Sequence, residues 1–151
     1  MRFLVAEIRD ANPLKREGSF DALTLLGKAP AMVAYKGPVT TKVQATMTHE
    51  GEVVFTGKVE SLMTFQCGRC LEPFDRVVKA DFQQVISPEG TEVDITNEIR
   101  ETVFLDLPVS AVCKETCKGI CPGCGINRNN ATCACVPATD VRWDGLKQLK
   151  I

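Results

Sequence analysis

Alternating apolar and polar residues run through the first two thirds of the chain and predict β-strands. The runs cover residues 2–8, 39–48, 53–66 and 74–86, with a short one at 93–95. The 39–48 run alternates, which is the period of a strand with one buried face, the 2–8 run alternates loosely, and the others are rich in strand-forming residues. His49-Glu50-Gly51-Glu52 lies between two long runs and predicts a hairpin turn. We therefore expect a twisted antiparallel sheet, which could close into a barrel.

Finer details of the strands also follow from the pattern. Val43, Ala45 and Met47 should share one face of their strand. In the 74–86 run, the residues expected to point inward are Phe74, Val78, Phe82 and Val85. A glycine inside a strand often marks a bulge, so Gly57 predicts one.

Two segments favour helices, which makes the expected fold class α+β with one or two helices. The first covers about residues 19–26, with Ser19 as its N-cap. The second covers about residues 97–105, where Thr96 could cap the start and Pro108 lies just beyond the end. Ile99, Val103 and Phe104 would share its buried face.

Length and composition fit one domain with a small appendage. The chain has 151 residues, and 44% of them are hydrophobic, which is enough for an ordinary core. We expect a β-rich α+β core at residues 1–110 and a cysteine-rich, zinc-binding segment at 111–151. No apolar run has the length of a membrane span, and the first ten residues lack a signal-peptide pattern. These features predict a cytoplasmic protein without a membrane partner, in a compartment where thiols stay reduced.

Eight cysteines form the most informative pattern in the chain. They are Cys67, Cys70, Cys113, Cys117, Cys121, Cys124, Cys133 and Cys135. Four thiolates complete one structural zinc site, so eight predict two sites. We assign the last four to one site because they are close in sequence, which leaves the first four for the other. The alternative pairs the two Cys-x2-Cys turns, at 67/70 and 121/124, with each other.

Other uses of cysteine fit the sequence less well. Cys117, Cys121 and Cys124 have the spacing of radical-SAM enzymes, but only 27 residues follow, too few for the barrel such enzymes need. Cys67-Gly68-Arg69-Cys70 resembles a redox motif, yet a β-patterned run follows it rather than a helix. A simple iron–sulfur electron carrier and a redox switch that ejects zinc remain alternatives to structural zinc.

Nothing else in the chain predicts catalysis or a small-molecule substrate. His49 is the only histidine and falls in the expected turn, and Asp94 and Glu98 suit the start of a helix. The net charge of −1 gives no general attraction to nucleic acid. The cations near the cysteines could either neutralise thiolates or contact a partner: Arg69, Lys114, Lys118 and Arg128. Trp143 could anchor the tail through an apolar helix face shared with Leu146 and Leu149.

The combined pattern resembles the YceD family, the large ribosomal RNA subunit accumulation proteins of bacteria and plastids. The resemblance rests on Cys67-x-Arg-Cys-Leu after a long strand, on the run from Cys113 to Asn127, and on Cys133-x-Cys135 with the tail at 140–149. It implies a non-enzymatic factor that supports synthesis, processing or stability of large-subunit (23S) ribosomal RNA. The implied partners are that RNA, a ribosomal protein or an assembly factor. A zinc-dependent adaptor or redox-sensing chaperone without a role in ribosomal RNA is the alternative.

Overall fold

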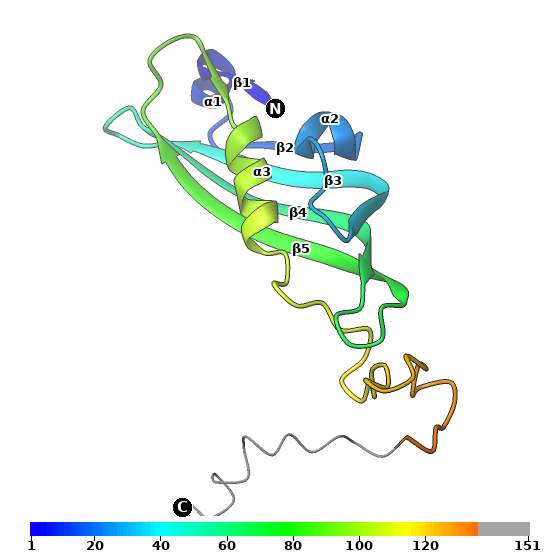
Figure 1. Ribbon diagram of the computed structural model, residues 1–151. Coiled ribbons are helices and arrows are strands. Elements are labelled where there is room, and N and C mark those ends of the chain that lie inside the picture. The colour runs from blue at the N-terminus through cyan, green and yellow to red at the C-terminus, as the bar shows by residue number, and fades with distance from the viewer. Residues whose placement is uncertain (136–151) are drawn as a thin grey trace, which may run out of the picture.

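The computed structural model describes residues 1–135 and shows a sheet with helices against one face (Figure 1). In chain order the elements are β1 (Arg2–Leu4), α1 (Val5–Asp10), β2 (Leu14–Phe20), α2 (Ala22–Leu26), β3 (Val33–Met47), β4 (Val53–Gln66), β5 (Pro73–Ile86), β6 (Glu92–Asp94) and α3 (Thr96–Leu105). The predicted α+β class is confirmed. None of the helices within residues 1–135 is long and apolar enough to cross a membrane.

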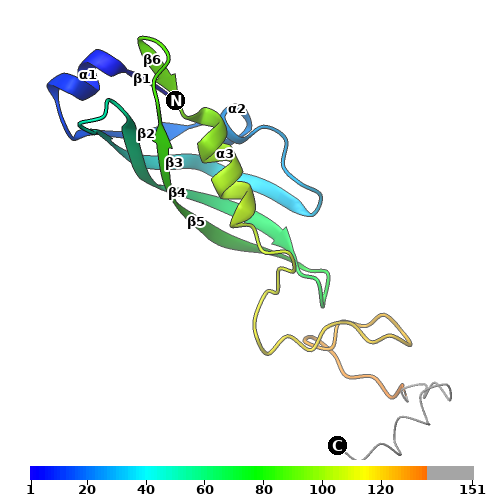
Figure 2. The same ribbon diagram turned by 90° about the vertical axis from the view of Figure 1, so that its left-hand side faces the viewer.

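The sheet is antiparallel and open. Its strand order is β2-β3-β4-β5, and β1 pairs separately with β6. In the described part of the chain no pairing joins β2 to β5, so the sheet does not close into a barrel. Helix α3 crosses the sheet on one face, and α2 lies on the same side near β3 (Figures 1 and 2).

The longest strands form two successive hairpins. β4 covers the predicted run 53–66, and its pairing with β5 is continuous from Val53↔Ile86 to Gln66↔Pro73. At the predicted turn before β4, the Thr48 amide donates to the Glu52 carbonyl at 2.8 Å. The β4–β5 hairpin closes at its other end over Cys67 and Cys70, so its regular pairing carries these cysteines to one end of the sheet.

One face of the sheet supplies most of the core. Its fully buried side chains include Val39, Phe55, Val59 and Met63, and α3 covers them with Ile99 and Val103. Phe3 from β1 packs against Phe55, with ring centroids 5.3 Å apart. At about 25 cal/mol per Å² of apolar surface removed from water, such burial is the main stabilising contribution to this body of the protein.

Two predicted element boundaries need correction. Residues 2–8 split into β1 and helix α1, because Ile8 reaches the core from one side of a helical turn. Ser19 does not cap the second helix, since it lies inside β2. Asp21 is the N-cap of α2, and its carboxylate accepts from the Thr24 amide at 2.9 Å. Strand β2 therefore includes Ser19, which the local sequence had assigned to the start of a helix.

The Gly57 bulge was also predicted wrongly. Pairing passes through Gly57 without a shift, and the irregularity lies between Tyr35 and Val39. Gly57 instead makes room for an aromatic ring: an added Cβ would lie 2.5 Å from Cε1 of Phe82. Val78 and Phe82 are buried as expected, but Val85 is 54% exposed.

Helix α3 matches the predicted segment, with a different residue at its start. Ile99 and Val103 are buried, whereas Phe104 is half-buried. Thr96 is the first helical residue rather than the cap: the N-cap is Ile95, and the Thr96 amide donates to Oδ1 of Asp94 at 3.0 Å. The helix ends at Leu105, and the chain then runs toward the hairpin end that carries Cys67 and Cys70 (Figure 1).

Candidate metal centres

The eight cysteines lie in two groups of four at one end of the sheet. The inner cluster is Cys67, Cys70, Cys113 and Cys117, and the outer cluster is Cys121, Cys124, Cys133 and Cys135. Within each cluster the four sulfur atoms are all within 4.8 Å of one another. All eight are free thiols rather than disulfides. The grouping matches the favoured assignment from the sequence, and the alternative pairing of 67/70 with 121/124 is not observed.

The inner cluster joins the sheet to the segment that follows α3. Cys67 and Cys70 flank the turn between β4 and β5, and the Cys67 amide donates to the Glu72 carbonyl at 3.0 Å to close it. The later segment docks beside this turn, where the Gly68 amide donates to the Ala111 carbonyl at 2.8 Å. Cys113 and Cys117 are thereby placed opposite the hairpin thiols.

Sulfur separations in the inner cluster fit a single tetrahedral ion. The Sγ atoms of Cys67 and Cys117 are 3.9 Å apart, and those of Cys70 and Cys113 are 3.7 Å apart. Thiolates about 2.3 Å from one tetrahedral zinc are about 3.8 Å from each other. In a multi-iron cluster the thiolates bind different irons and stand further apart. The donor set and its spacing therefore suit one ion per cluster.

Backbone and side-chain donors surround the inner sulfurs. The amides of Arg69 and Cys113 point to Sγ of Cys67 at 3.5 and 3.4 Å, and Nδ2 of Asn129 lies 3.4 Å from Sγ of Cys117. Burial opposes ionisation of Cys67, but these amides and that of Cys70 outweigh it and lower its pKa to about 6. Such donors are the usual outer shell of a thiolate metal site.

Mutual repulsion opposes the ionisation of all four inner thiols together. Burial and the neighbouring thiols of Cys117, Cys67 and Cys70 raise the pKa of Cys113 to about 12. A divalent ion would remove this repulsion, because it favours every thiolate at once. The cluster thus combines Cys67, whose pKa is lowered without a metal, with Cys113, which would ionise near neutral pH only beside a bound cation.

The outer cluster is built on a tight glycine-containing turn. The Gly125 amide donates to the Cys121 carbonyl at 2.8 Å, and Gly125 has φ +73°, a conformation that glycine adopts without strain. Amides of Cys124 and Gly123 lower the pKa of Cys121 to about 6, while the neighbouring thiols of Cys124 and Cys121 raise that of Cys135 to about 12. Unlike the inner thiols, Cys124 and Cys135 are exposed.

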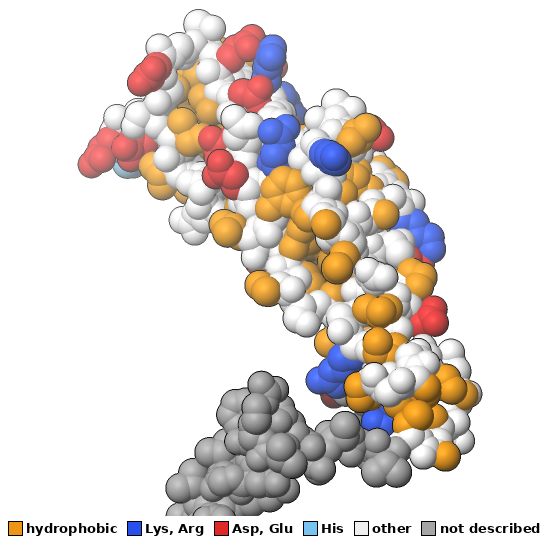
Figure 3. All heavy atoms as spheres, viewed as in Figure 1, with side chains coloured by type: hydrophobic (Ala, Val, Ile, Leu, Met, Phe, Trp, Pro, Cys, Tyr) orange, Lys and Arg blue, Asp and Glu red, His pale blue; other side chains and the backbone are white. Residues whose placement is uncertain are grey.

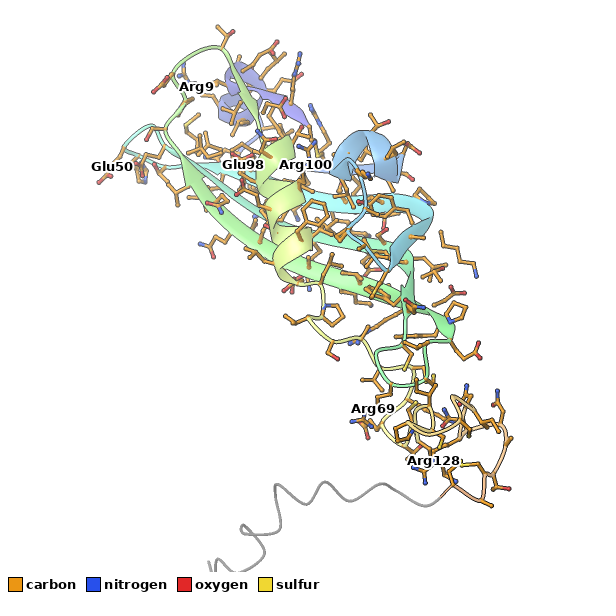
Figure 4. All side chains as sticks on the ribbon, viewed as in Figure 1. Arg9, Glu50, Arg69, Glu98, Arg100 and Arg128 are labelled. Carbon is orange, nitrogen blue, oxygen red and sulfur yellow. The ribbon has the colours of Figure 1, made fainter. Side chains whose placement is uncertain are left out.

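Arg69 holds the two halves of the inner cluster together, a role that the sequence did not indicate. Its Nη1 atom donates to the carbonyls of Glu115 and Cys117 at 3.2 and 3.3 Å. Its own carbonyl accepts from the Ile120 amide at 3.0 Å. Arg69 and Arg128 both lie at the cysteine end of the molecule, far from Arg9 and Glu50 at the other end (Figure 4). Lys114, Lys118 and Arg128 are exposed there.

Other residues considered from the sequence lie outside this site. His49 is exposed in the β3–β4 turn. Burial opposes ionisation of Asp94, yet hydrogen bonds from Thr96 hold the pKa of its carboxyl well below the usual range, which suits a hydrogen-bond acceptor before α3 rather than proton transfer. Trp143, Leu146 and Leu149 lie outside the described residues.

Three polar residues that contribute to the site were missed. Asn129 reaches the inner cluster, Asn127 orients Asn129, and Glu72 accepts from Asn127 at 3.4 Å. The sequence contained one usable signal, an Asn-x-Asn pair within the turn-prone loop between Cys124 and Cys133. Asparagine side chains commonly satisfy backbone groups in such loops.

Comparison with known proteins finds one family description repeatedly. The family model described as large ribosomal RNA subunit accumulation protein YceD matches residues 83–150. A chloroplastic YCED homolog 1 of Arabidopsis thaliana is 44% identical over 48 residues, covering 32% of this chain and 15% of that protein. Its counterpart in Zea mays is 26% identical over 158 residues, covering 75% of this chain and 53% of that protein.

A third relative carries no functional name. An uncharacterized protein of Mycobacterium tuberculosis is 31% identical over 91 residues, covering 49% of this chain and 44% of that protein. The chain spans about half the length, or less, of the curated relatives it matches. No solved structure matches it. The matches confirm the resemblance of this chain to the YceD family of large ribosomal RNA subunit accumulation proteins.

Proposed function

We propose that each cysteine cluster holds one zinc ion. The ligands would be Cys67, Cys70, Cys113 and Cys117 in the inner site and Cys121, Cys124, Cys133 and Cys135 in the outer one. Support comes from sulfur separations of 3.7 and 3.9 Å, near the value for one tetrahedral ion, and from amide donors aimed at the sulfurs. A single iron would fit the same geometry, so metal analysis has to distinguish the two.

The zinc ions would act as structural fasteners rather than catalysts. Four thiolates fill the coordination sphere of zinc and leave no position for water or substrate. The inner ion would tie the α+β core, residues 1–110, to the cysteine-rich segment, residues 111–151. Structural zinc contributes roughly 10–16 kcal/mol of apparent binding free energy, enough to decide whether such a segment folds.

At the level of the cell, we propose a non-enzymatic ribosome-biogenesis factor. It would support the synthesis, processing or stability of large-subunit (23S) ribosomal RNA. The observation that carries this proposal is the two-cluster cysteine pattern, found in a chain whose relatives are named for accumulation of the large ribosomal RNA subunit.

Charge at the cysteine end bears on the partner. Residues 67–72 and 113–135 carry four cations (Arg69, Lys114, Lys118 and Arg128) and two acids (Glu72 and Glu115). Each zinc with four thiolates would add a charge of about −2, which leaves this end slightly negative. Acidic side chains also gather at the opposite end (Figure 3). Tight binding to phosphates needs a basic surface, so this distribution favours a ribosomal protein or assembly factor over bare RNA as the direct contact.

Depletion of the protein tests the cellular role. We expect the ratio of 23S to 16S ribosomal RNA to fall on depletion, and to recover with the wild-type gene but not with a Cys67→Ser, Cys117→Ser double variant. A Gly90→Ala variant is the matched control, because nothing lies within 4 Å of the added Cβ. An unchanged ratio after complete depletion would contradict the proposed role.

A zinc-dependent, redox-sensing chaperone is the second candidate. The exposure of Cys124 and Cys135 favours it, since exposed thiolates are the ones that peroxide reaches. Peroxide would take two electrons from a pair of these thiols, forming a disulfide and water and releasing the outer zinc. This function requires that oxidised protein gain affinity for an unfolded client. Zinc release without any gain in client binding would remove it.

A further inference from the structure

Asn129 connects the two clusters. It lies in the loop between Cys124 and Cys133, which belong to the outer cluster, yet its side chain contacts Cys117 of the inner one. The outer cluster holds both ends of this loop. The position of Asn129 against the inner sulfur therefore depends on how the outer cluster is folded.

Both ends of the Asn129 amide are used, which fixes its orientation. The Lys118 amide donates to Oδ1 of Asn129 at 2.9 Å, so the other atom, Nδ2, is the one that faces Sγ of Cys117 at 3.4 Å. The second Nδ2 hydrogen goes to Oδ1 of Asn127 at 2.8 Å, and that oxygen also accepts from the Asn129 backbone amide at 3.0 Å. Every donor of the side chain is thus satisfied.

The loop that carries Asn129 is anchored to both sides of the inner cluster. The Arg128 amide donates to the Gly119 carbonyl at 2.9 Å, and Nδ2 of Asn127 donates to Glu72 beside the hairpin turn at 3.4 Å. Gly119 itself has φ +70°, and an added Cβ would lie 3.0 Å from the Arg69 carbonyl. The loop is therefore bonded to the 117–120 segment, which itself lies against the 67–70 turn, and to Glu72 just after that turn.

We propose that Asn129 is a positioning residue that couples the two metal centres. When the outer ion folds the 125–132 loop, the loop presents an N–H donor to the Cys117 thiolate and raises the affinity of the inner site. Binding linkage is reciprocal, so a loaded inner site raises the affinity of the outer one by the same factor. This inference rests on the proposed metal binding and adds that the two ions bind cooperatively.

The test uses the full chain loaded with zinc and competed against a chromophoric chelator. Asn129→Asp keeps the oxygen that accepts from Lys118 but replaces the donor with a negative oxygen facing Cys117. We expect the affinity of the inner site to fall about 10- to 100-fold, as for other outer-shell partners of metal ligands. Asn130→Asp is the matched control, because it adds the same charge on the neighbouring, exposed residue and should change the affinity less than about threefold.

A double-mutant cycle separates coupling from a local effect. Cys124→Ser together with Cys133→Ser removes the outer ion, which should weaken the inner site to a similar degree. In that background, Asn129→Asp should have little further effect, because the loop no longer presents the side chain. Asn129→Ala serves as a second variant in case the aspartate prevents folding, and amide exchange of the β4–β5 hairpin reports whether the core is intact.

The outcomes distinguish this inference from the metal proposal. Additive effects in the cycle, or an Asn129→Asp variant that behaves like Asn130→Asp, would overturn the coupling while leaving two zinc centres in place. A wild-type chain that binds no metal would overturn both. In wild type, the inner zinc should be released about 10- to 100-fold more easily once the outer zinc is gone, and no such change in Asn129→Asp would support the coupling.

Discussion

The inner and outer cysteine clusters use the same four ligand types in different settings. The inner thiols come from two stretches, at 67–70 and 113–117, and Cys67, Cys70 and Cys117 are buried. The outer thiols all lie within residues 121–135, and two of them are exposed. The inner cluster therefore joins parts that are distant in sequence, whereas the outer one folds a single short stretch. Position in the chain, rather than ligand chemistry, separates their roles.

The two Cys-x2-Cys turns show the same contrast on a smaller scale. In each, the amide after the second cysteine donates to the carbonyl of the first: Leu71 to Cys67 at 2.9 Å and Gly125 to Cys121 at 2.8 Å. Both residues have positive φ, +61° and +73°. Glycine accepts this conformation freely, while leucine does not. The inner turn thus holds a strained and half-exposed leucine where the outer turn has an unstrained glycine.

Loss of an inner ligand should have the largest effect. Cys67→Ser removes a buried thiol that receives two amide donors, so we expect at least one zinc per chain to be lost. Amide exchange should then become fast in residues 111–135, because the inner ion fastens that segment. The β3–β4 and β4–β5 hairpins should stay protected. A variant that retains full zinc and full protection would show that the inner cluster is not a metal site.

Loss of an outer ligand should have a smaller and more local effect. Cys124→Ser removes an exposed thiol, and we expect the outer zinc to be lost while the inner zinc stays bound with weakened affinity. For the same reason, a limiting amount of peroxide or chelator should remove the outer ion from wild type before the inner one. Mass spectrometry of the intact, metal-bound protein follows the two steps. Loss of the inner ion first would reverse the proposed order.

A substitution in the sheet should leave both clusters loaded. Gly57→Ala would push a Cβ to 2.5 Å from the Phe82 ring and 3.0 Å from the Lys42 carbonyl, which should cost about 1–3 kcal/mol in the free energy of unfolding. Gly90→Ala meets no neighbouring atom and should change it by less than about 0.5 kcal/mol. Denaturant unfolding followed with zinc analysis checks both. Loss of zinc in folded Gly57→Ala would show that the clusters depend on sheet packing more widely than proposed.

Exchange of the two turn residues should have the smallest effect. Leu71→Gly removes about 1 kcal/mol of left-handed backbone strain from the folded state. Glycine also raises the conformational entropy of the unfolded chain, which costs a similar free energy on folding. The free energy of unfolding should therefore change by less than about 1 kcal/mol. Gly125→Ala places a side chain at φ +73° and should destabilise the outer turn by about 1–2 kcal/mol. Thermal unfolding of the zinc-loaded chain compares the two. A strongly destabilised Leu71→Gly would mean that the leucine packs in an essential contact.

Much of this architecture was predictable where the signal was periodic or repeated. The 53–66 strand, its hairpin partner and the α3 segment follow from apolar spacing, and the cysteine grouping follows from proximity in sequence. The errors came from tertiary context. Asp21 rather than Ser19 caps α2 because pairing with β3 extends β2 through Phe20, and Gly57 serves the Phe82 ring rather than a bulge. Asn129 was missed because its target is a sulfur from the other cluster.

Metal content of the purified full chain tests the central claim most directly. Elemental analysis of protein kept reduced, normalised to chain concentration, should give two zinc ions per chain and only traces of iron. One zinc per chain would mean that one of the two clusters is not a metal site. A chain that contains iron in place of zinc, or no metal, would contradict the account of two structural zinc centres.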